Sequence, residues 1–198
     1  MLVAAGELFA ARGFAPVTMR AIGDSAGLDN SSLYRHFASK SELAREVLRR
    51  AMAELADEMV PSAAQMAPTL EGLVEFGTRA ALHLWDHPNT ARLILHWTIS
   101  AKDSATGFDV SLPIDAVGAP SGDFYRGIVG LFDATRKAGE AREVAWPEAF
   151  VAIVGAVALR PATYRSLLAS QEPQRSAAAA RNAWEQEVRI LLRGMLTP

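Results

Sequence analysis

Residues 18–43 read TMRAIGDSAGLDNSSLYRHFASKSEL, a stretch in which helix caps alternate with short helical segments. Thr18 has the side chain preferred at a helix N-cap, so a short helix is expected over Met19–Ser25. Gly27 is expected to end it, because glycine readily adopts the left-handed backbone conformation that follows many helices. A second capped segment follows almost at once.

Asp29 is the next N-cap, and it predicts a helix over Asn30–His36. Ser39, with Glu42 three residues later, forms a capping box for a longer helix that is expected to run to Met59, before Pro61. On the other side, residues 2–12 are expected to form a helix that stops at Gly13. Two short helices joined by a tight turn form a helix-turn-helix, although an ordinary helical hairpin has the same outline.

The polar content of the segment 30–36 favours a DNA-reading helix over a plain hairpin. Leu33 and Phe37 lie four residues apart and can anchor one face, which leaves the polar side chains outward. Asn can pair with adenine and Arg with guanine in the major groove, whereas hydroxyl, imidazole and ammonium groups suit phosphate oxygens. The expected DNA contacts are Thr18, Arg20, Asn30, Ser31, Ser32, Tyr34, Arg35, His36 and Lys40.

These segments resemble the N-terminal signature of TetR-family regulators. The resemblance rests on AGELFAARGF (5–14), TMRAIGDSAGL (18–28), SLYRHF (32–37) and SKSEL (39–43), about the first quarter of the chain. It implies an all-α protein with a helix-turn-helix DNA-binding domain at residues 1–45 and a helical effector-binding and dimerisation domain at 46–198. It further implies a homodimer that binds a pseudo-palindromic double-stranded DNA operator and a small-molecule effector, more often as a repressor than as an activator.

Composition agrees with such a protein without requiring it. The 198 residues are 50% hydrophobic and contain no cysteine, so disulfides and thiol catalysis are excluded. The net charge is −2, but residues 1–50 hold seven Lys/Arg and five Asp/Glu, so the positive charge lies in the expected DNA-binding part. The opening residues carry no basic secretory signal, and the most apolar run, 149–159, is too short to span a bilayer. A cytoplasmic protein with no membrane partner is expected.

The rest of the chain predicts further helices over 69–87, 89–102, 124–137, 147–159 and 174–195, with a non-periodic connection at 103–123. The last helix carries one apolar stripe, and 149–159 is apolar on all sides. An ordinary core would explain both patterns, but the resemblance suggests a four-helix dimer interface. The residues expected there are Val151, Val154, Ala158, Trp184, Val188, Leu191 and Met195.

Small and aromatic residues on the middle helices are candidates for a mostly apolar effector pocket, although aromatic residues at helical spacing are usually core. The candidates are Gly77, Ala81, Trp85, Leu93, Trp97, Phe108, Phe124, Ile128 and Phe132.

Catalysis and metal binding have little support. The sequence has no phosphate-binding loop, no Gly-x-Ser-x-Gly and no His-Glu-x-x-His. His83 and His87 are spaced for a shared metal ion, with His96 on the next helix, but His87 beside Pro88 is as easily a helix-end residue. No enzyme activity, cofactor or metal is therefore expected. The alternatives are a helical interaction module that has lost DNA binding, and a small metal-binding helical protein.

Overall fold

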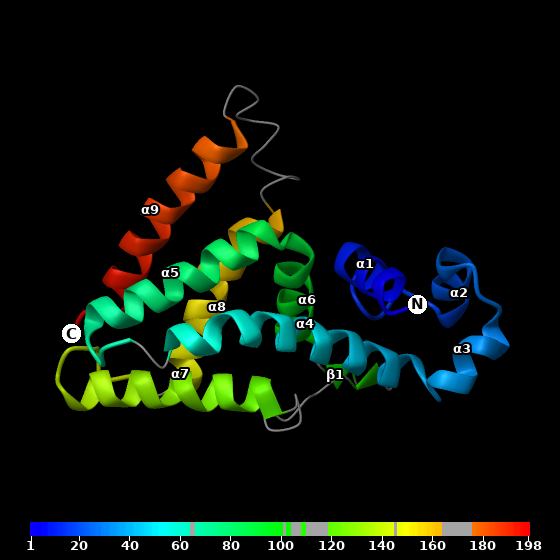
Figure 1. Cartoon of the computed structure of the whole chain (residues 1–198), viewed down its shortest axis with the longest axis horizontal. Coiled ribbons are helices and arrows are strands. Elements are labelled where there is room, and N and C mark those ends of the chain that lie inside the picture. Colours follow the sequence, from blue (N-terminus) through cyan, green and yellow to red (C-terminus); the bar gives the residue numbers. More distant parts are fainter. Residues whose placement is uncertain (64–65, 101, 104–107, 110–118, 145, 164–175) are drawn as a thin grey trace.

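The structure is a computed structural model that describes residues 1–63, 66–100, 102–103, 108–109, 119–144, 146–163 and 176–198. Its described part is almost entirely helical, with three short helices gathered at one end and longer helices filling the rest (Figure 1). Among the described helices, none has both the length and the apolar character that a bilayer span needs.

The first three helices are α1 (Leu2–Arg12), α2 (Met19–Ala26) and α3 (Asn30–His36), close to the predicted bounds. Gly13 ends α1 with a φ of 79°, and Gly27 ends α2 in the left-handed region with a φ of 65°. Both positions therefore need the conformational freedom of glycine. The three helices enclose a small core in which Phe9, Ile22 and Leu33 are fully buried.

Helix α4 (Lys40–Ala63) links the two halves of the molecule. Ser39 Oγ accepts a hydrogen bond from the Glu42 backbone N–H, as the capping box predicts. The helix continues through Pro61 rather than ending at Met59, because a proline in the last turn removes only one helical hydrogen bond.

The remaining helices are α5 (Leu70–Asp86), α6 (Pro88–Ser100), α7 (Ala119–Lys137), α8 (Trp146–Thr163) and α9 (Ala177–Leu196). Two-residue strands β1 (Lys102–Asp103) and β2 (Phe108–Asp109) pair antiparallel between α6 and α7.

Three expectations for these helices were wrong in detail. Helix α6 begins at Pro88 rather than at residue 89. The first residue of a helix donates no intrahelical hydrogen bond, so the missing N–H of proline does not disturb the helix there. Strand β1 begins at Lys102, which was predicted to end a helix, and α7 begins at Ala119. The predicted loop 103–123 therefore contains the rest of the strand pair and the start of a helix. Helix α8 passes through Pro161, which again lies in a last turn, and ends at Thr163.

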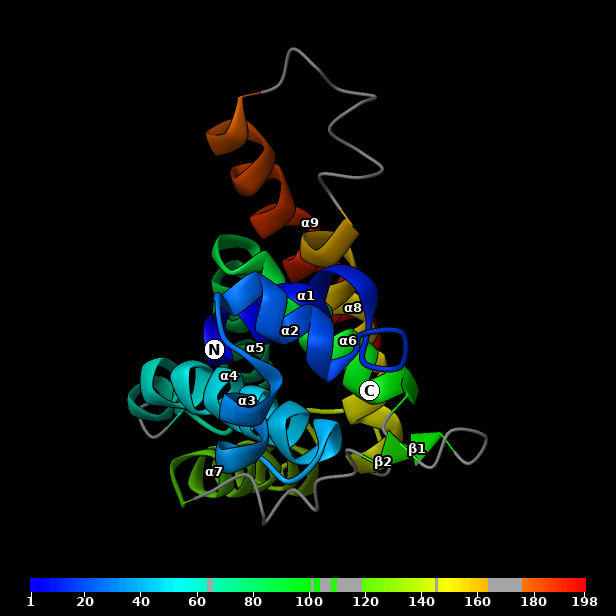
Figure 2. The same ribbon diagram turned by 90° about the vertical axis from the view of Figure 1, so that its right-hand side faces the viewer.

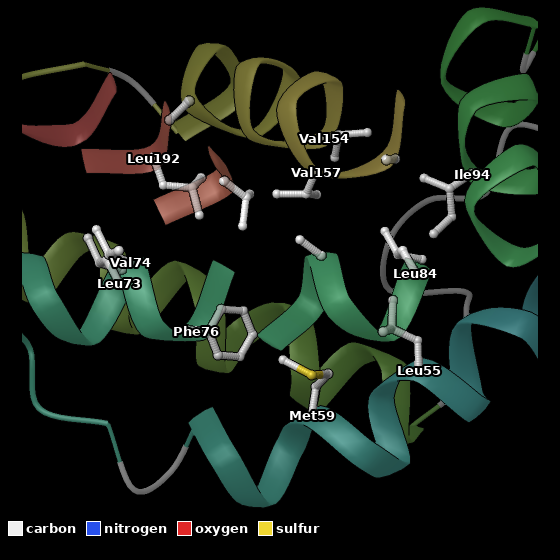
Figure 3. Close-up of a cluster of buried hydrophobic side chains, with 14 of the residues drawn as sticks. Leu55, Met59, Leu73, Val74, Phe76, Leu84, Ile94, Val154, Val157 and Leu192 are labelled. Atoms are coloured by element: carbon white, nitrogen blue, oxygen red, sulfur yellow. The ribbon is translucent and has the colours of Figure 1, made fainter. Parts of the chain in front are cut away.

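The larger core surrounds α5, which packs against α8 and α9, while α4 packs against α7 and α6 against α8. Figure 3 shows side chains from these helices meeting in one space, among them Phe76, Val157 and Leu192. Trp184 and Phe132 are the largest side chains that are fully buried there.

The two cores meet along α4 and α6. Residue 45, the predicted domain boundary, lies inside α4. Leu48 of α4 belongs to the N-terminal core and Leu55 to the larger one, while Met52 packs against both. Leu93 of α6 also belongs to the N-terminal core. The two halves are therefore joined by shared helices rather than by a loop.

Candidate nucleic-acid interface

Helices α2 and α3 stand at the end of the molecule opposite α9 (Figure 1), the end that faces the viewer in Figure 2. Met19 of α2 and Leu33 of α3 are buried in the N-terminal core, and Leu33 has no exposed surface. Thr18 Oγ1 accepts a hydrogen bond from the Ala21 N–H at 3.1 Å, which confirms its place as the N-cap of α2. The opposite faces of both helices are left to solvent.

Asp29 organises the N-terminus of α3. Its Oδ1 accepts hydrogen bonds from Ser31 Oγ at 2.6 Å and from the Ser32 N–H at 2.8 Å, and its Oδ2 accepts one from Ser32 Oγ at 3.1 Å. The hydrogen bond from Ser31, followed by those from Ser32, lowers the pKa of Asp29 to about 2. Arg35 Nη2 donates to Ser32 Oγ at 2.9 Å, so the chain of hydrogen bonds runs along the exposed face.

Replacing Asp29 with alanine is expected to lower Tm by about 2–4 °C at pH 7, because α3 loses its N-cap. Since the pKa of the folded-state carboxyl lies below its ordinary value of 3.8, its contribution is complete above about pH 4 and is lost as the pH falls toward 2. The Tm difference between wild type and Asp29→Ala should therefore shrink over that interval, as followed by circular dichroism. Asp29→Asn, which can still cap, is the control. A difference that does not change between about pH 7 and pH 2 would contradict the assignment.

The predicted DNA contacts lie at this end of the chain. Arg20, Ser31, Arg35 and His36 are exposed, and Tyr34 is 54% exposed although it is a large aromatic residue. Thr18 is exposed at the start of α2, and Ser32 is partly buried. Asn30 begins α3, but its side chain lies outside the described residues.

Lys40 differs from the other predicted contacts. Its Nζ donates to the Ala15 carbonyl oxygen at 2.8 Å, and partial burial lowers the pKa of its ammonium group. In this conformation Lys40 ties the start of α4 to the loop before α2. Contact with a phosphate would require this side chain to turn outward or to share its donors.

A second candidate site is a cavity of about 110 Å³ in the larger core. Four of the predicted pocket residues line it: Gly77, Trp97, Ile128 and Phe132. Its other described lining residues come from α4 to α9 and are all apolar: Met52, Leu55, Leu73, Phe76, Ala80, Leu84, Ile94, Ile153, Val154, Val157, Ala158, Leu192 and Leu196.

The other predicted pocket residues lie elsewhere. Ala81 is fully buried against Trp184, whose Nε1 donates to the Ala81 carbonyl oxygen at 3.4 Å. Leu93 faces the N-terminal core, and Trp85 packs on the larger core without lining the cavity. The side chains of Phe108 and Phe124 lie outside the described residues. Spacing within one helix did not reveal the lining residues of α4, α8 and α9, because they meet only through packing.

Four of the seven residues predicted at a dimer interface are buried within the single chain. Val154 and Ala158 line the cavity, and Trp184 and Val188 are at most 1% exposed. Leu191 is 47% exposed and Met195 partly exposed, while the side chain of Val151 lies outside the described residues. The buried stripe of α9 continues from Val188 to Leu192 and Leu196, not to Leu191 and Met195.

The histidines do not converge on one site. His83 Nδ1 lies 2.6 Å from Glu58 Oε2, and His87 Nδ1 lies 3.0 Å from the His83 carbonyl oxygen. The His83 and His87 rings stack with centroids 4.2 Å apart, whereas His96 packs edge-on against Phe14 in the N-terminal half. Across the described part of the chain, no group of three or more potential ligands could hold a metal ion.

This arrangement, a capped helix-turn-helix with an exposed polar second helix on a larger helical body, defines the class of helix-turn-helix regulatory proteins. Residues 1–47 match the sequence model of "Bacterial regulatory proteins, tetR family". The first 47 residues therefore carry the DNA-binding domain of the TetR family, and the predicted resemblance and all-α fold are confirmed.

Similarity to curated proteins is concentrated in the N-terminal part. The chain is 42% identical over 77 residues to the HTH-type transcriptional repressor KstR2 of Rhodococcus jostii, a match that covers 37% of this chain and 38% of that protein. It is 49% identical over 49 residues to KstR2 of Mycobacterium tuberculosis, covering 25% and 24% of the two chains. The matched segment thus spans well under half of these relatives.

Solved structures match the fold along the whole length. A TetR family transcription regulator from Marinobacter aquaeolei VT8 aligns with a TM-score of 0.68 at 17% identity, covering 99% of this chain and 93% of that chain. The ketosteroid transcriptional regulator KstR2 of Mycobacterium tuberculosis aligns with a TM-score of 0.64 at 23% identity, covering 100% and 93%. At these identities the likeness concerns the fold.

Proposed function

We propose that the protein is a sequence-specific DNA-binding transcriptional regulator that reads a pseudo-palindromic operator as a homodimer. The observation that carries the proposal is the exposed polar face of α2 and α3, which holds Arg20, Tyr34 and Arg35 on helices anchored by Leu33. Arg35 and Arg20 have the side chains that pair with guanine, and the N-terminal part of α3 carries hydroxyl groups suited to phosphate or base edges. A fixed helix with outward polar groups is what the major groove admits.

A dimer is supported by apolar residues that the single chain leaves exposed on α8 and α9. Leu159 is 55%, Ile190 72% and Leu191 47% exposed, and the two helices pack against each other. Large exposed aliphatic residues on adjoining helices favour an interface between subunits. Dimeric helix-turn-helix proteins bind half-sites about 34–36 Å apart, so we expect the dimer to hold its two copies of α3 at that spacing.

Replacing Ile190 with glutamate is expected to raise the dimer dissociation constant by about tenfold or more, because a two-fold interface would bury the carboxylate twice without a partner. Analytical ultracentrifugation over a concentration series measures the change. Val3→Glu, at a residue 67% exposed on α1, is the matched control and should leave association unchanged. An unchanged dissociation constant for Ile190→Glu would place the interface elsewhere.

The effector part of the proposal rests on the apolar cavity. It lies in the larger core, and its lining residues Met52 and Trp97 also pack against the N-terminal core. We expect a small, largely apolar molecule to fit the cavity only when the two copies of α3 stand at one particular distance from each other. Its binding would then shift the population of dimers toward that distance. We propose that the effector releases the protein from DNA and that the protein is a repressor, as the KstR2 relatives are. A further relative, FasR of Mycolicibacterium smegmatis, is named an activator.

Selection of random duplex DNA by the purified protein tests the proposal. We expect enrichment of a pseudo-palindromic site whose affinity falls with rising salt, since neutralised phosphates release counterions. A helical interaction module would enrich no sequence and show no salt-dependent binding. The selection is done at low salt with folded protein from which small molecules have been removed by refolding. If no sequence is enriched under these conditions, the protein does not bind DNA sequence-specifically and the proposal is wrong.

A further inference from the structure

Helix α5 contributes one continuous stripe of residues to the lining of the apolar cavity. They recur at helical spacing and therefore share one face of the helix: Leu73, Phe76, Gly77, Ala80 and Leu84. Leu84 follows Leu73 by eleven residues, which corresponds to about 16 Å along the axis, or about three turns of helix. The cavity therefore extends along α5 instead of forming a compact space.

Different helices bound the two ends of the cavity. Figure 3 shows Leu73 and Leu192 on one side of the space and Leu84 and Ile94 on the other. All four of these residues line the cavity. Helices α5 and α9 come close together at Gly77, where an added Cβ atom would lie 2.6 Å from Leu192 Cδ1. The cavity is thus bounded by α9 toward the start of α5 and by α6 toward its end.

The cavity is narrow for its length. Its volume is about 110 Å³, whereas a compact apolar cavity that binds benzene has about 150 Å³. A smaller volume spread along about three turns of helix leaves a cross-section too small for fused or bridged rings. The walls include the buried side chains of Phe76, Leu84 and Phe132, and a close-packed interior resists added volume. This shape fits an unbranched chain.

Two small residues in the middle of the stripe leave the room for such a chain. Gly77 has no side chain and Ala80 has a single methyl group, while larger residues precede and follow them. A side chain at Gly77 would collide with Leu192. Ala80 is partly buried, so a larger side chain there would fill the middle of the cavity.

We propose that the effector carries an unbranched, uncharged alkyl chain that lies along α5 between Leu73 and Leu84. This proposal rests on the cavity being the effector site of the proposed function. Among the described lining residues none is charged, so a carboxylate or phosphate inside the cavity would be desolvated without a counter-charge. Binding is driven by removal of the chain from water, to which each CH₂ group contributes a similar amount.

The experiment compares straight-chain alcohols, from n-butanol to n-decanol, with adamantanol, a cage-shaped alcohol about as hydrophobic as n-hexanol. Isothermal titration calorimetry with the full-length protein measures the dissociation constants. We expect affinity for the straight chains to rise about fourfold with each added CH₂ group and to level off once the chain fills the cavity. Adamantanol should bind about tenfold or more weakly than n-hexanol, because the cage would force the packed walls apart.

The variant Ala80→Leu tests where the chain lies. Its added side chain should shorten the length at which affinity levels off, and should weaken binding of n-octanol about tenfold or more while n-butanol is affected less. Ala178→Leu, at an exposed position on α9, is the control and should bind every alcohol like wild type. Circular dichroism checks the folding of both variants. The comparison of chain and cage in wild type decides the inference if Ala80→Leu does not fold.

The inference would be overturned by affinity that never levels off, by adamantanol binding as tightly as n-hexanol, or by no binding of any alcohol. A folded Ala80→Leu variant that binds n-octanol like wild type would also overturn it. Binding to the selected operator is measured in parallel, with and without n-octanol. Intact operator binding beside a failed alcohol result rejects the effector chemistry alone, while wild type that binds no operator rejects the proposed function. Alcohol binding that leaves operator affinity unchanged would mean that the cavity is not the effector site.

Discussion

Replacement of Trp184 with alanine is expected to lower the free energy of unfolding by about 3–5 kcal/mol, the cost of removing a large buried aromatic side chain. Trp184 is 1% exposed in the larger core, where α9 meets α5 and α8. Its Nε1 donates to the Ala81 carbonyl oxygen, and the Arg160 guanidinium lies over its ring at 5.5 Å. The substitution would remove the packing, leave the Ala81 carbonyl without this donor and free Arg160 from its aromatic contact.

Urea denaturation at a fixed protein concentration measures the effect, since association would otherwise change the apparent stability. Gln186→Ala, at an exposed position two residues further along α9, should stay within about 0.5 kcal/mol of wild type. A loss below about 1 kcal/mol for Trp184→Ala would mean that α9 is not anchored by this residue.

Replacement of Arg20 with alanine is expected to weaken operator binding by about 1–3 kcal/mol, roughly 5- to 150-fold, and to relax sequence preference at one position of each half-site. Arg20 is exposed on α2, beside the polar face of α3, and its side chain has the donors that pair with guanine. Because it contributes nothing to the buried core, Tm should change little.

Fluorescence anisotropy with the selected duplex measures this affinity at two salt concentrations. Lys137→Ala removes one positive charge at the exposed end of α7, away from α2 and α3, and should leave operator affinity nearly unchanged. Unchanged affinity of Arg20→Ala would remove this residue from the interface. An equal loss in both variants would indicate general charge attraction rather than base reading.

The N-terminal half was predicted closely from sequence because its signals are local. Thr18, Asp29 and Ser39 each accept a hydrogen bond from a backbone N–H three residues further along the chain, in the first turn of the following helix. Gly13 and Gly27 stop helices through their own backbone angles. The candidate DNA contacts follow directly, since they are the polar residues on helices whose apolar residues are buried.

The surroundings of the apolar residues on α8 and α9 were harder to predict, because an apolar pattern does not determine which neighbouring helix a residue packs against. On α9 the expected stripe moved by one residue after Val188, so Leu192 and Leu196 are buried while Leu191 and Met195 turn outward. On α8 the apolar residues divide between the cavity, which receives Val154 and Ala158, and the surface, which exposes Leu159.

From sequence alone, the TetR-type N-terminal domain, the all-helical class and the bounds of the first three helices were determined, since caps, glycines and short-range periodicity act within a few residues. The tertiary structure alone decided which sides of α8 and α9 are buried, that α4 and α6 belong to both cores, and that an apolar cavity extends along one face of α5. Those features arise where helices distant in sequence meet, and their relative placement depends on how all of the side chains pack at once.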